Sequence, residues 1–219
     1  MRLNGMEIQT LTVGTFQENA YLVIDDETRH AVLIDPGAEG ERLVAAVDSA
    51  GAKLQAIWLT HAHVDHVGGI AAVKRATGVP VLMHPAGAPL YEGAVQHALF
   101  FGLSIEEPPP VDAPLTEGQT LEFGSLAFEV METPGHAPGH VVIHGHGVAF
   151  VGDCLFAGSI GRTDLPFSNG AQLASSLARI AALPEDTMVY PGHGPVTTIG
   201  RERETNPFLN GAARVPGAA

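Results

Sequence analysis

The chain has 219 residues, 45% of them hydrophobic and 16% charged, which excludes a disordered, collagen-like or coiled-coil protein. Eleven Lys and Arg residues stand against 24 Asp and Glu residues, and the net charge of −13 disfavours nucleic acid and anionic membrane surfaces as partners. The sequence has neither an apolar run long enough to span a membrane nor an apolar signal core, and its one cysteine suits a reducing compartment. We therefore expect a single cytoplasmic domain over residues 1–219.

The first half of the chain predicts a meander of strands followed by alternating helices and strands. Apolar runs that end in turn signals, such as Asp35-Pro36-Gly37, indicate the strands. Apolar residues on one face of a 3.6-residue period indicate the helices. The predicted strands are 6–13, 20–25, 30–34, 54–59 and 79–83, and the predicted helices are 39–50 and 70–77, followed by a partly helical, irregular segment over 85–101.

The second half repeats this order of strands followed by a helix. Strands are expected over 120–123, 126–131, 141–144, 148–151 and 188–190, with a helix over 171–183 and a short helix near the end. Two rounds of strands followed by helices imply an α+β fold in which two sheets form a sandwich with helices outside.

The most specific motif is a cluster of four residues of metal-ligand type directly after the strand 54–59. It contains His61, His63, Asp65 and His66. At an extended strand end, residues two apart share a face, so His61 and His63 can hold one ion. If the chain turns into a helix near Asp65, then Asp65 and His66 point to another side and can reach a second ion. A closed structural zinc site is usually rich in cysteine, so an open, reactive site is favoured here.

Three further ligand-type residues follow other predicted strands, each beside a glycine. They are His136 in Pro134-Gly135-His136, Asp153 in Gly152-Asp153, and His193 in Pro191-Gly192-His193. Each tripeptide or dipeptide alone is usually an ordinary turn. Together with the cluster at 61–66, they predict a metal centre at the carboxyl ends of several strands.

With these residues in view, the chain resembles the metallo-β-lactamase superfamily, whose five motifs occur in order over nearly its whole length. The resemblance implies a four-layer αββα sandwich. It implies that His61, His63 and His136 bind a first metal, that Asp65, His66 and His193 bind a second, that Asp153 bridges both, and that Asp35 supports the site from outside the ligands. Asp65 and Asp153 are also the expected catalytic residues.

Within that superfamily, the chain is most similar to small glyoxalase II-like hydrolases, through the segments 16–22, 152–156, 158–164 and 201–209. The resemblance implies hydrolysis of thioesters such as S-D-lactoylglutathione by a hydroxide that bridges two divalent metal ions. Zinc is expected, with iron or manganese as alternatives. The stretch after His193 is too short for the C-terminal helical domain that helps full-length glyoxalase II to hold glutathione, so we expect a single domain without it.

Other functions remain open from the sequence. A persulfide dioxygenase shares the expected fold but holds one iron with two histidines and one aspartate. The presence of Asp65, His66 and His193 favours a filled second site instead. A lactonase or β-lactamase-type hydrolase would use the same chemistry, and a metal-stapled binding module without catalysis is the non-enzyme alternative.

Substrate contacts are less clearly marked. Arg162 is a candidate substrate anchor or a brace for its own loop with Asp164, while Tyr91 and Phe101 are candidates for a pocket wall or a separate apolar cluster. Cys154 is expected to be a small buried side chain. His140, His144 and His146 are expected at the surface or around the ligands, with His144 and His146 on one strand face, whereas Phe16, Asn19 and Tyr21 lie near the metal mouth or pack in a hairpin. The expected partner is a small thioester, and the chain is expected to be a monomer or a homodimer.

Overall fold

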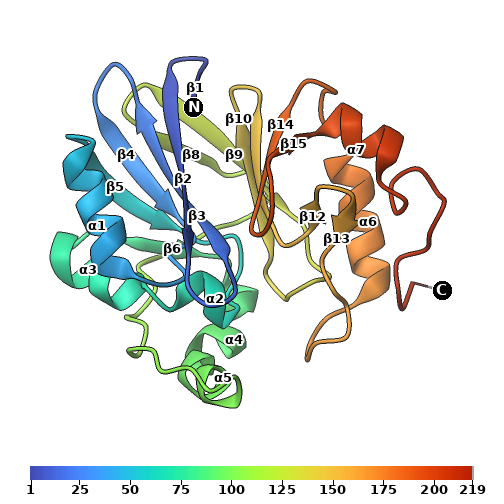
Figure 1. The fold of residues 1–219 in the computed structure, drawn as a ribbon, viewed down its shortest axis with the longest axis horizontal. Coiled ribbons are helices and arrows are strands. Elements are labelled where there is room, and N and C mark those ends of the chain that lie inside the picture. The colour runs from blue at the N-terminus through green and yellow to red at the C-terminus, as the bar shows by residue number, and fades with distance from the viewer. Residues whose placement is uncertain (219) are drawn as a thin grey trace.

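The computed structural model describes residues 1–218, with Arg2 described by its backbone alone. Two β-sheets face each other, and helices cover the outer face of each sheet (Figure 1). Helices α1 (Gly40–Ser49) and α3 (Ile70–Thr77) cover the first sheet, and α6 (Gly170–Ile180) and α7 (Ile199–Thr205) cover the second. This confirms the expected αββα sandwich.

Within residues 1–218, the first sheet has seven strands in chain order. They are β1 (Arg2–Leu3), β2 (Met6–Val13), β3 (Glu18–Asp25), β4 (His30–Ile34), β5 (Lys53–Trp58), β6 (Val81–Met83) and β7 (Ala113–Pro114). Strands β1 to β4 pair antiparallel and β4 to β7 pair parallel. The parallel pairs need crossover connections, which α1, the single turn α2 (Val64–Val67) and α3 provide between β4 and β6.

The second sheet has the order β15-β14-β11-β10-β9-β8. These strands are β8 (Thr120–Phe123), β9 (Leu126–Glu132), β10 (Val141–Gly145), β11 (Val148–Gly152), β14 (Met188–Pro191) and β15 (Thr197–Thr198). Helix α6 connects the parallel neighbours β11 and β14, and the other pairs are antiparallel. A small hairpin of β12 (Leu155–Phe156) and β13 (Ser159–Ile160) follows β11.

Alternation along the strands gives each sheet two apolar faces. In β3, Leu22 and Ile24 pack toward the helices, whereas Tyr21 and Val23 point into the core between the sheets. Strand β11 divides in the same way, with Phe150 between the sheets. Because side chains on a strand alternate between its faces, three cores separate the four layers.

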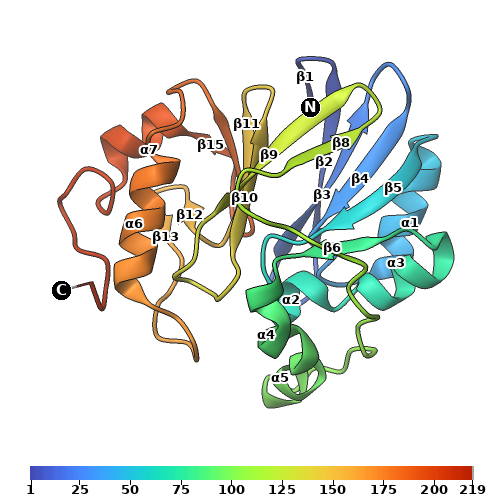
Figure 2. The ribbon, with the colours of Figure 1, turned by 180° about the vertical axis from the view of Figure 1, so that it is seen from behind.

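Helices α4 (Ala88–Glu92) and α5 (Ala94–Phe100), preceded by the 3-10 turn η1 (Pro85–Gly87), extend from one edge of the sandwich (Figure 2). They pack against α2, which follows β5. The loops after β5, β9, β11 and β14 come together at this edge, since the residues that they carry are in contact there.

The predicted long elements match the structure to within a few residues at their ends. Strands 6–13, 30–34 and 120–123 and helix 70–77 have the predicted bounds. The two-residue strands β1, β7, β12, β13 and β15 were not predicted. None of the helices in the described part of the chain has the length and apolar character needed to cross a membrane.

Candidate metal centre

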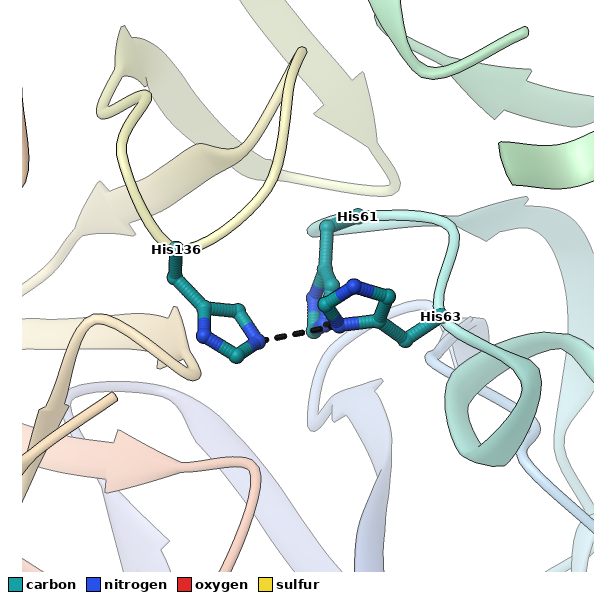
Figure 3. Close-up of side chains that lie close together, drawn as sticks. All are labelled: His61, His63 and His136. Atoms are coloured by element: carbon teal, nitrogen blue, oxygen red, sulfur yellow. Dashed lines mark hydrogen bonds between the residues drawn. The ribbon is translucent and has the colours of Figure 1, made fainter. Parts of the chain in front are cut away.

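The first group of candidate ligands consists of three imidazoles whose ring nitrogens converge. His61 Nε2 lies 3.1 Å from His63 Nδ1, and His136 Nε2 lies 2.9 Å from the same atom (Figure 3). His61 and His63 come from the segment between β5 and α2, and His136 comes from the loop after β9. Three nitrogen ligands at this spacing can share one metal ion.

Hydrogen bonds at the far side of two rings orient this group. His136 Nδ1 donates to the carbonyl oxygen of Arg162 at 2.9 Å. His61 Nδ1 lies 3.0 Å from Thr60 Oγ1. Because these contacts occupy Nδ1, the lone pair of each Nε2 points into the centre of the group.

The second group comprises Asp65, His66 and His193, whose ligand atoms lie within 4.8 Å of one another. His193 Nε2 is 3.2 Å from Asp65 Oδ2. His63 has an extended backbone and immediately precedes α2, whereas Asp65 and His66 lie inside this helical turn. The chain thus turns into a helix at Asp65, the condition under which the sequence placed Asp65 and His66 in a second group, and their ligand atoms lie near that of His193.

Asp153 lies between the two groups. Its Oδ2 is 3.6 Å from His136 Nε2 and 3.5 Å from His193 Nε2, and its Oδ1 is 3.4 Å from His66 Nε2. A side chain at position 192 would collide with Asp153 Oδ1 and with the ring of His66, so Gly192 is needed beside the centre. One carboxylate thus faces imidazoles of both groups.

Asp35 follows β4 and fixes the second group from behind. Its Oδ1 accepts a hydrogen bond from the Thr60 backbone N–H at 2.7 Å. Its Oδ2 accepts from Thr60 Oγ1 at 2.6 Å and lies 3.0 Å from His66 Nδ1. A carboxylate bonded to Nδ1 of an imidazole leaves Nε2 free for a metal, which is the arrangement that outer partners of metal ligands commonly have.

The imidazoles of the first group favour the neutral form. Burial, reinforced by neighbouring imidazoles, lowers the pKa of His61 well below its ordinary value. Burial and the nearby His136 lower the pKa of His63 to about 3. Burial also lowers the pKa of His136, although Asp153 opposes this shift. Neutral imidazoles have the free lone pairs that a metal requires.

Opposite charges are paired in and around the second group. Although burial opposes its protonation, the carboxylate of Asp153 raises the pKa of His66 well above its ordinary value, and Asp35 raises it further. Burial would raise the pKa of Asp153, but His66 and His136 hold it below the usual range. The pKa of His193 is raised by Asp65 and Asp153 against the effect of burial. These carboxylates favour positive charge here, which a metal ion would supply in place of protons.

Two buried atoms among the candidate ligands have no hydrogen-bond partner among the described residues: His66 Nε2 and Asp153 Oδ1. Buried polar atoms are nearly always paired in folded proteins, and leaving one unpaired costs about 1–3 kcal/mol. Both atoms are good metal donors, and they lie 3.4 Å from each other. The residues therefore fit a metal ion at this position.

His140 lies around the ligands, which is one of the two places that the sequence allowed, but its contact with Asp153 was not predicted. His140 is fully buried, stacks on His61 with ring centroids 4.9 Å apart, and accepts the Asp153 backbone N–H at Nε2 over 3.1 Å. Its Nδ1 lies 2.9 Å from Thr133 Oγ1. The contact could not be found from the sequence, because the group that His140 accepts from is a backbone N–H.

Other residues named from the sequence have clear places. Cys154 is fully buried, as expected, and burial raises the pKa of its thiol to about 12. His146 lies in the turn between β10 and β11 with a φ of 50°, so the prediction that it shares a strand face with His144 is wrong. Asn19 and Tyr21 donate from their side chains to the Pro191 carbonyl oxygen and so hold the turn that carries His193.

A cavity of about 860 Å³ opens over the two groups. Phe101 and Arg162 line it, together with His63, Asp65, His136, Asp153 and His193. Arg162 is mostly exposed and forms a two-pronged ion pair with Asp164 at 2.6 and 2.8 Å, which is the loop brace that the sequence allowed.

Tyr91 requires a correction. Its side chain is buried, its hydroxyl donates to the Pro109 carbonyl oxygen at 2.8 Å, and it lines a different cavity between α4 and the segment 107–114. The packing of that segment over α4 keeps Tyr91 away from the two groups, so it is not a wall of the cavity above them.

Comparison with known proteins shows the family to which the chain belongs. The family model described as the metallo-beta-lactamase superfamily matches residues 13–193. The chain belongs to this superfamily, and it is a metal-binding hydrolase of that class.

Individual relatives extend over almost the entire chain. Hydroxyacylglutathione hydrolase GloC from Haemophilus influenzae is 40% identical, covering 94% of this chain and 99% of that protein. The crystal structure of TTHA1623 in a di-iron-bound form is 50% identical with a TM-score of 0.85, covering 92% of this chain and 100% of the other. The crystal structure of BLEG-1 B3 metallo-beta-lactamase is 39% identical with a TM-score of 0.87, with 93% and 99% covered.

Proposed function

We propose that this protein hydrolyses thioesters, with S-D-lactoylglutathione as a representative substrate, at a centre of two divalent metal ions. The observation that carries the proposal is the pair of convergent ligand groups at the base of one cavity, joined by Asp153. His61, His63 and His136 would hold the first ion, and Asp65, His66 and His193 the second, with Asp153 between them.

A pair of divalent ions at this position would lower the pKa of a shared water molecule and polarise the carbonyl oxygen of the substrate. In the net reaction the oxygen of water bonds to the carbonyl carbon, the C–S bond breaks, and a carboxylate, a thiol and one proton are released. Asp65 and Asp153 are the two carboxylates in the described lining of this cavity, and we propose that they accept hydrogen bonds from the reacting water.

Residues around the ligands hold this geometry. Asp35 fixes both Thr60 and His66, and the Arg162 carbonyl oxygen fixes His136. Because these partners are backbone or buried groups, the ligands are oriented before a metal binds. Such preorganisation supports a reactive centre.

For the metal, we propose zinc, with iron or manganese as alternatives. Imidazole and carboxylate ligands suit all three ions. The similarity to a protein crystallised in a di-iron-bound form supports iron as the strongest of the alternatives. Metal analysis by mass spectrometry of protein purified without added metal distinguishes them.

The proposed partner is a small thioester, and the proposed location is the cytoplasm. The net charge of −13 disfavours polyanions such as nucleic acids, and the one cysteine suits a reducing compartment. Similarity to the relative named hydroxyacylglutathione hydrolase supports a glutathione thioester.

The decisive experiment measures release of thiol from S-D-lactoylglutathione by metal-loaded protein, before and after dialysis against a chelator. We expect hydrolysis that disappears with the metal while the circular dichroism spectrum persists. If the metal-loaded protein consumes oxygen with glutathione persulfide and holds one iron per chain, it is a dioxygenase instead. If the metal-loaded protein does not hydrolyse the thioester and the chelator unfolds it, the protein is a binding module that the metal stabilises.

A second candidate function is hydrolysis of β-lactams. The similarity to BLEG-1 B3 metallo-beta-lactamase favours it, and the same centre can attack a strained amide or a lactone. Parallel assays with a cephalosporin and a lactone show which class has the higher kcat/KM.

A further inference from the structure

The walls of the cavity above the two ligand groups are mainly apolar. Phe16 from the loop before β3 and Phe101 from the end of α5 form one side, and their rings meet edge to face with centroids 5.4 Å apart. Phe156 and Ile160 from the β12–β13 hairpin also line the cavity. A pocket of about 860 Å³ is in the size class of cavities that bury a whole small molecule.

Aromatic side chains also remain exposed at the rim of this cavity. Phe101 is 49% exposed and the neighbouring Phe100 is 85% exposed, with their rings 5.3 Å apart. A group of large apolar side chains left open to water commonly marks a surface that binds an apolar partner. Here these side chains border the candidate active site.

The apolar wall reaches the position where the reaction would occur. The ring of Phe156 lies 6.0 Å from the ring of His193, edge to face. The Phe16 carbonyl oxygen lies 3.2 Å from His193 Nδ1, so the segment that carries Phe16 is also next to the ligands. The acyl group of a bound thioester would therefore lie next to aromatic rings.

Charged groups for a hydrophilic substrate are scarce in the cavity. Apart from the candidate ligands, its polar lining consists of Gln96, His97, Ser159 and Arg162. Arg162 is the only Lys or Arg in this lining, and Asp164 already pairs with it at 2.6 Å. The glutathione moiety carries two carboxylates and an ammonium group, and these find little compensation here. We expect this moiety to extend toward the opening and the acyl group to occupy the apolar space.

We propose that the cavity selects thioesters with a bulky apolar acyl group, aromatic or branched, over those with a small hydroxyacyl group such as lactoyl. This inference rests on the proposed function, since it names the substrate class of the same centre. Phe16, Phe101 and Phe156 are the residues that set the preference. Each added methylene buried in such a pocket is expected to raise kcat/KM about fourfold.

The test compares S-phenylacetylglutathione with S-D-lactoylglutathione, which share their thiol and differ in the acyl group. Each kcat/KM is divided by the rate of hydrolysis of that thioester by hydroxide alone, so that intrinsic reactivity cancels. We expect the corrected value for phenylacetyl to be at least about tenfold higher. Binding without reaction is measured by calorimetry with two thioethers, and S-benzylglutathione should bind at least about tenfold tighter than S-methylglutathione.

Two matched variants locate the preference. Phe101→Ala should reduce the phenylacetyl-to-lactoyl ratio at least about fivefold, because it removes an aromatic wall. Phe167→Ala is the control, since Phe167 is 66% exposed and does not line the cavity, and it should leave the ratio unchanged. Both side chains are substantially exposed, so loss of folding is not expected from either change.

The outcomes separate the two proposals. If both thioesters are hydrolysed and the corrected kcat/KM for lactoyl equals or exceeds that for phenylacetyl, the acyl preference is overturned and thioester hydrolysis still stands. An equal change of the ratio in the two variants overturns the role of Phe101. Absence of hydrolysis of either thioester by metal-loaded protein overturns the proposed function, and the acyl preference with it.

Discussion

Strand β3 begins and ends with a residue whose carboxyl group is buried, and the hydrogen bonds of the two carboxyl groups differ. Asp25, the last residue, accepts hydrogen bonds from the backbone N–H groups of Glu27 and Ser125 and from the hydroxyls of Thr28 and Ser125. Glu18, the first residue, has no hydrogen-bond partner for either oxygen within the described chain. One end of the strand therefore has a carboxyl group with hydrogen bonds to both oxygens, and the other end has a carboxyl group with none in the described chain.

At the Asp25 end, the carboxylate joins the two sheets. Ser125 lies in the turn between β8 and β9 of the second sheet. A side chain at Gly124, which has a φ of +57°, would collide with Asp25 Oδ2. Although burial opposes it, hydrogen bonds from Thr28 and Ser125 lower the pKa of Asp25 to about 2. The hydrogen bonds at the Asp25 end therefore stabilise the packing of the two sheets.

At the Glu18 end, Glu18, His66 and Asp153 have buried atoms without a hydrogen bond among the described residues. Burial raises the pKa of Glu18 well above its ordinary value. Unpaired buried groups cost stability, and proteins keep them mainly where function requires them. The contrast separates an end of the sandwich that serves stability from the end that carries the chemistry. Mutations at the Asp25 end should mainly change stability, and mutations among the ligands should mainly change activity.

The largest effect is expected from Asp153→Asn, which keeps the size of the side chain and removes its charge. Because a neutral amide cannot replace a carboxylate between two cations, kcat/KM for S-D-lactoylglutathione should fall about 1,000-fold. The midpoint of thermal unfolding of the metal-free protein should shift by only a few degrees. Thiol release, metal content and circular dichroism measure the three properties. Full turnover in this variant would contradict the assignment of Asp153.

His140→Phe should have the next largest effect and shows how far the functional end extends. The ring that stacks on His61 remains, but the acceptor for the Asp153 N–H is lost. Outer partners of metal ligands typically contribute about 10–100-fold, so kcat/KM or metal affinity should fall by that factor. Metal retention against graded chelator provides a measurement independent of turnover.

Cys154→Ala is the matched control for His140→Phe. Cys154 is buried beside His140, and its Sγ lies 3.3 Å from the Thr133 carbonyl oxygen and 3.4 Å from His140 Nδ1. Within the described residues, its side chain forms no hydrogen bond with a candidate ligand. Its loss should cost about 1 kcal/mol of stability and leave metal retention unchanged. Equal loss of metal in both variants would show that general packing, rather than the N–H acceptor, is what matters.

The sequence predicted the long elements because their apolar periods are strong. Helix α3 and strand β4 have the bounds read from periodicity, whereas two-residue strands such as β7 and β12 are too short to show a period. The ligand-type residues were found for a related reason: each follows an apolar strand, and strand ends meet at one edge of a sheet.

Long-range partners could not be predicted in the same way. The backbone of Glu18 forms an isolated β-bridge with that of His193, a contact between residues far apart in the chain. His140 accepts a backbone N–H, and no side-chain pattern reveals a backbone donor. The sequence left Tyr91 open between a pocket wall and a separate apolar cluster, because its hydroxyl partner, the Pro109 carbonyl oxygen, lies in a segment without periodic signals. Local patterns specify elements, while tertiary contacts decide which side chains reach the cavity.

Asp25→Asn should affect stability and spare activity. Loss of a charged acceptor in this network should lower the free energy of unfolding by about 2 kcal/mol and the unfolding midpoint by roughly 4–8 °C. The folded-state pKa of about 2 lies below the usual value for an unfolded chain, so the ionised carboxylate stabilises the protein above about pH 4. This contribution is lost as the pH falls toward 2.

Urea unfolding of wild type and Asp25→Asn at pH 7, 5 and 3 measures this effect. The difference between the two proteins should be full at pH 7 and should shrink toward pH 3. A difference that grows as the pH falls would contradict the role assigned to the Asp25 carboxylate. Hydrolysis of S-D-lactoylglutathione at 25 °C should remain within about twofold of wild type, because Asp25 lies at the other end of β3 from the ligands.

The smallest effect, and the sharpest test of the contrast, is expected from Glu18→Gln on the same strand. A buried carboxyl group with a raised pKa costs stability as the pH rises above the unfolded value of about 4.3 toward the folded pKa. The amide removes this cost, so the metal-free protein should gain up to about 1 kcal/mol at pH 8 and less at pH 5. Urea unfolding of metal-free protein at the two pH values measures the gain. A loss as large as that of Asp25→Asn would show that Glu18 is satisfied as Asp25 is, and the distinction between the two ends of β3 would fail.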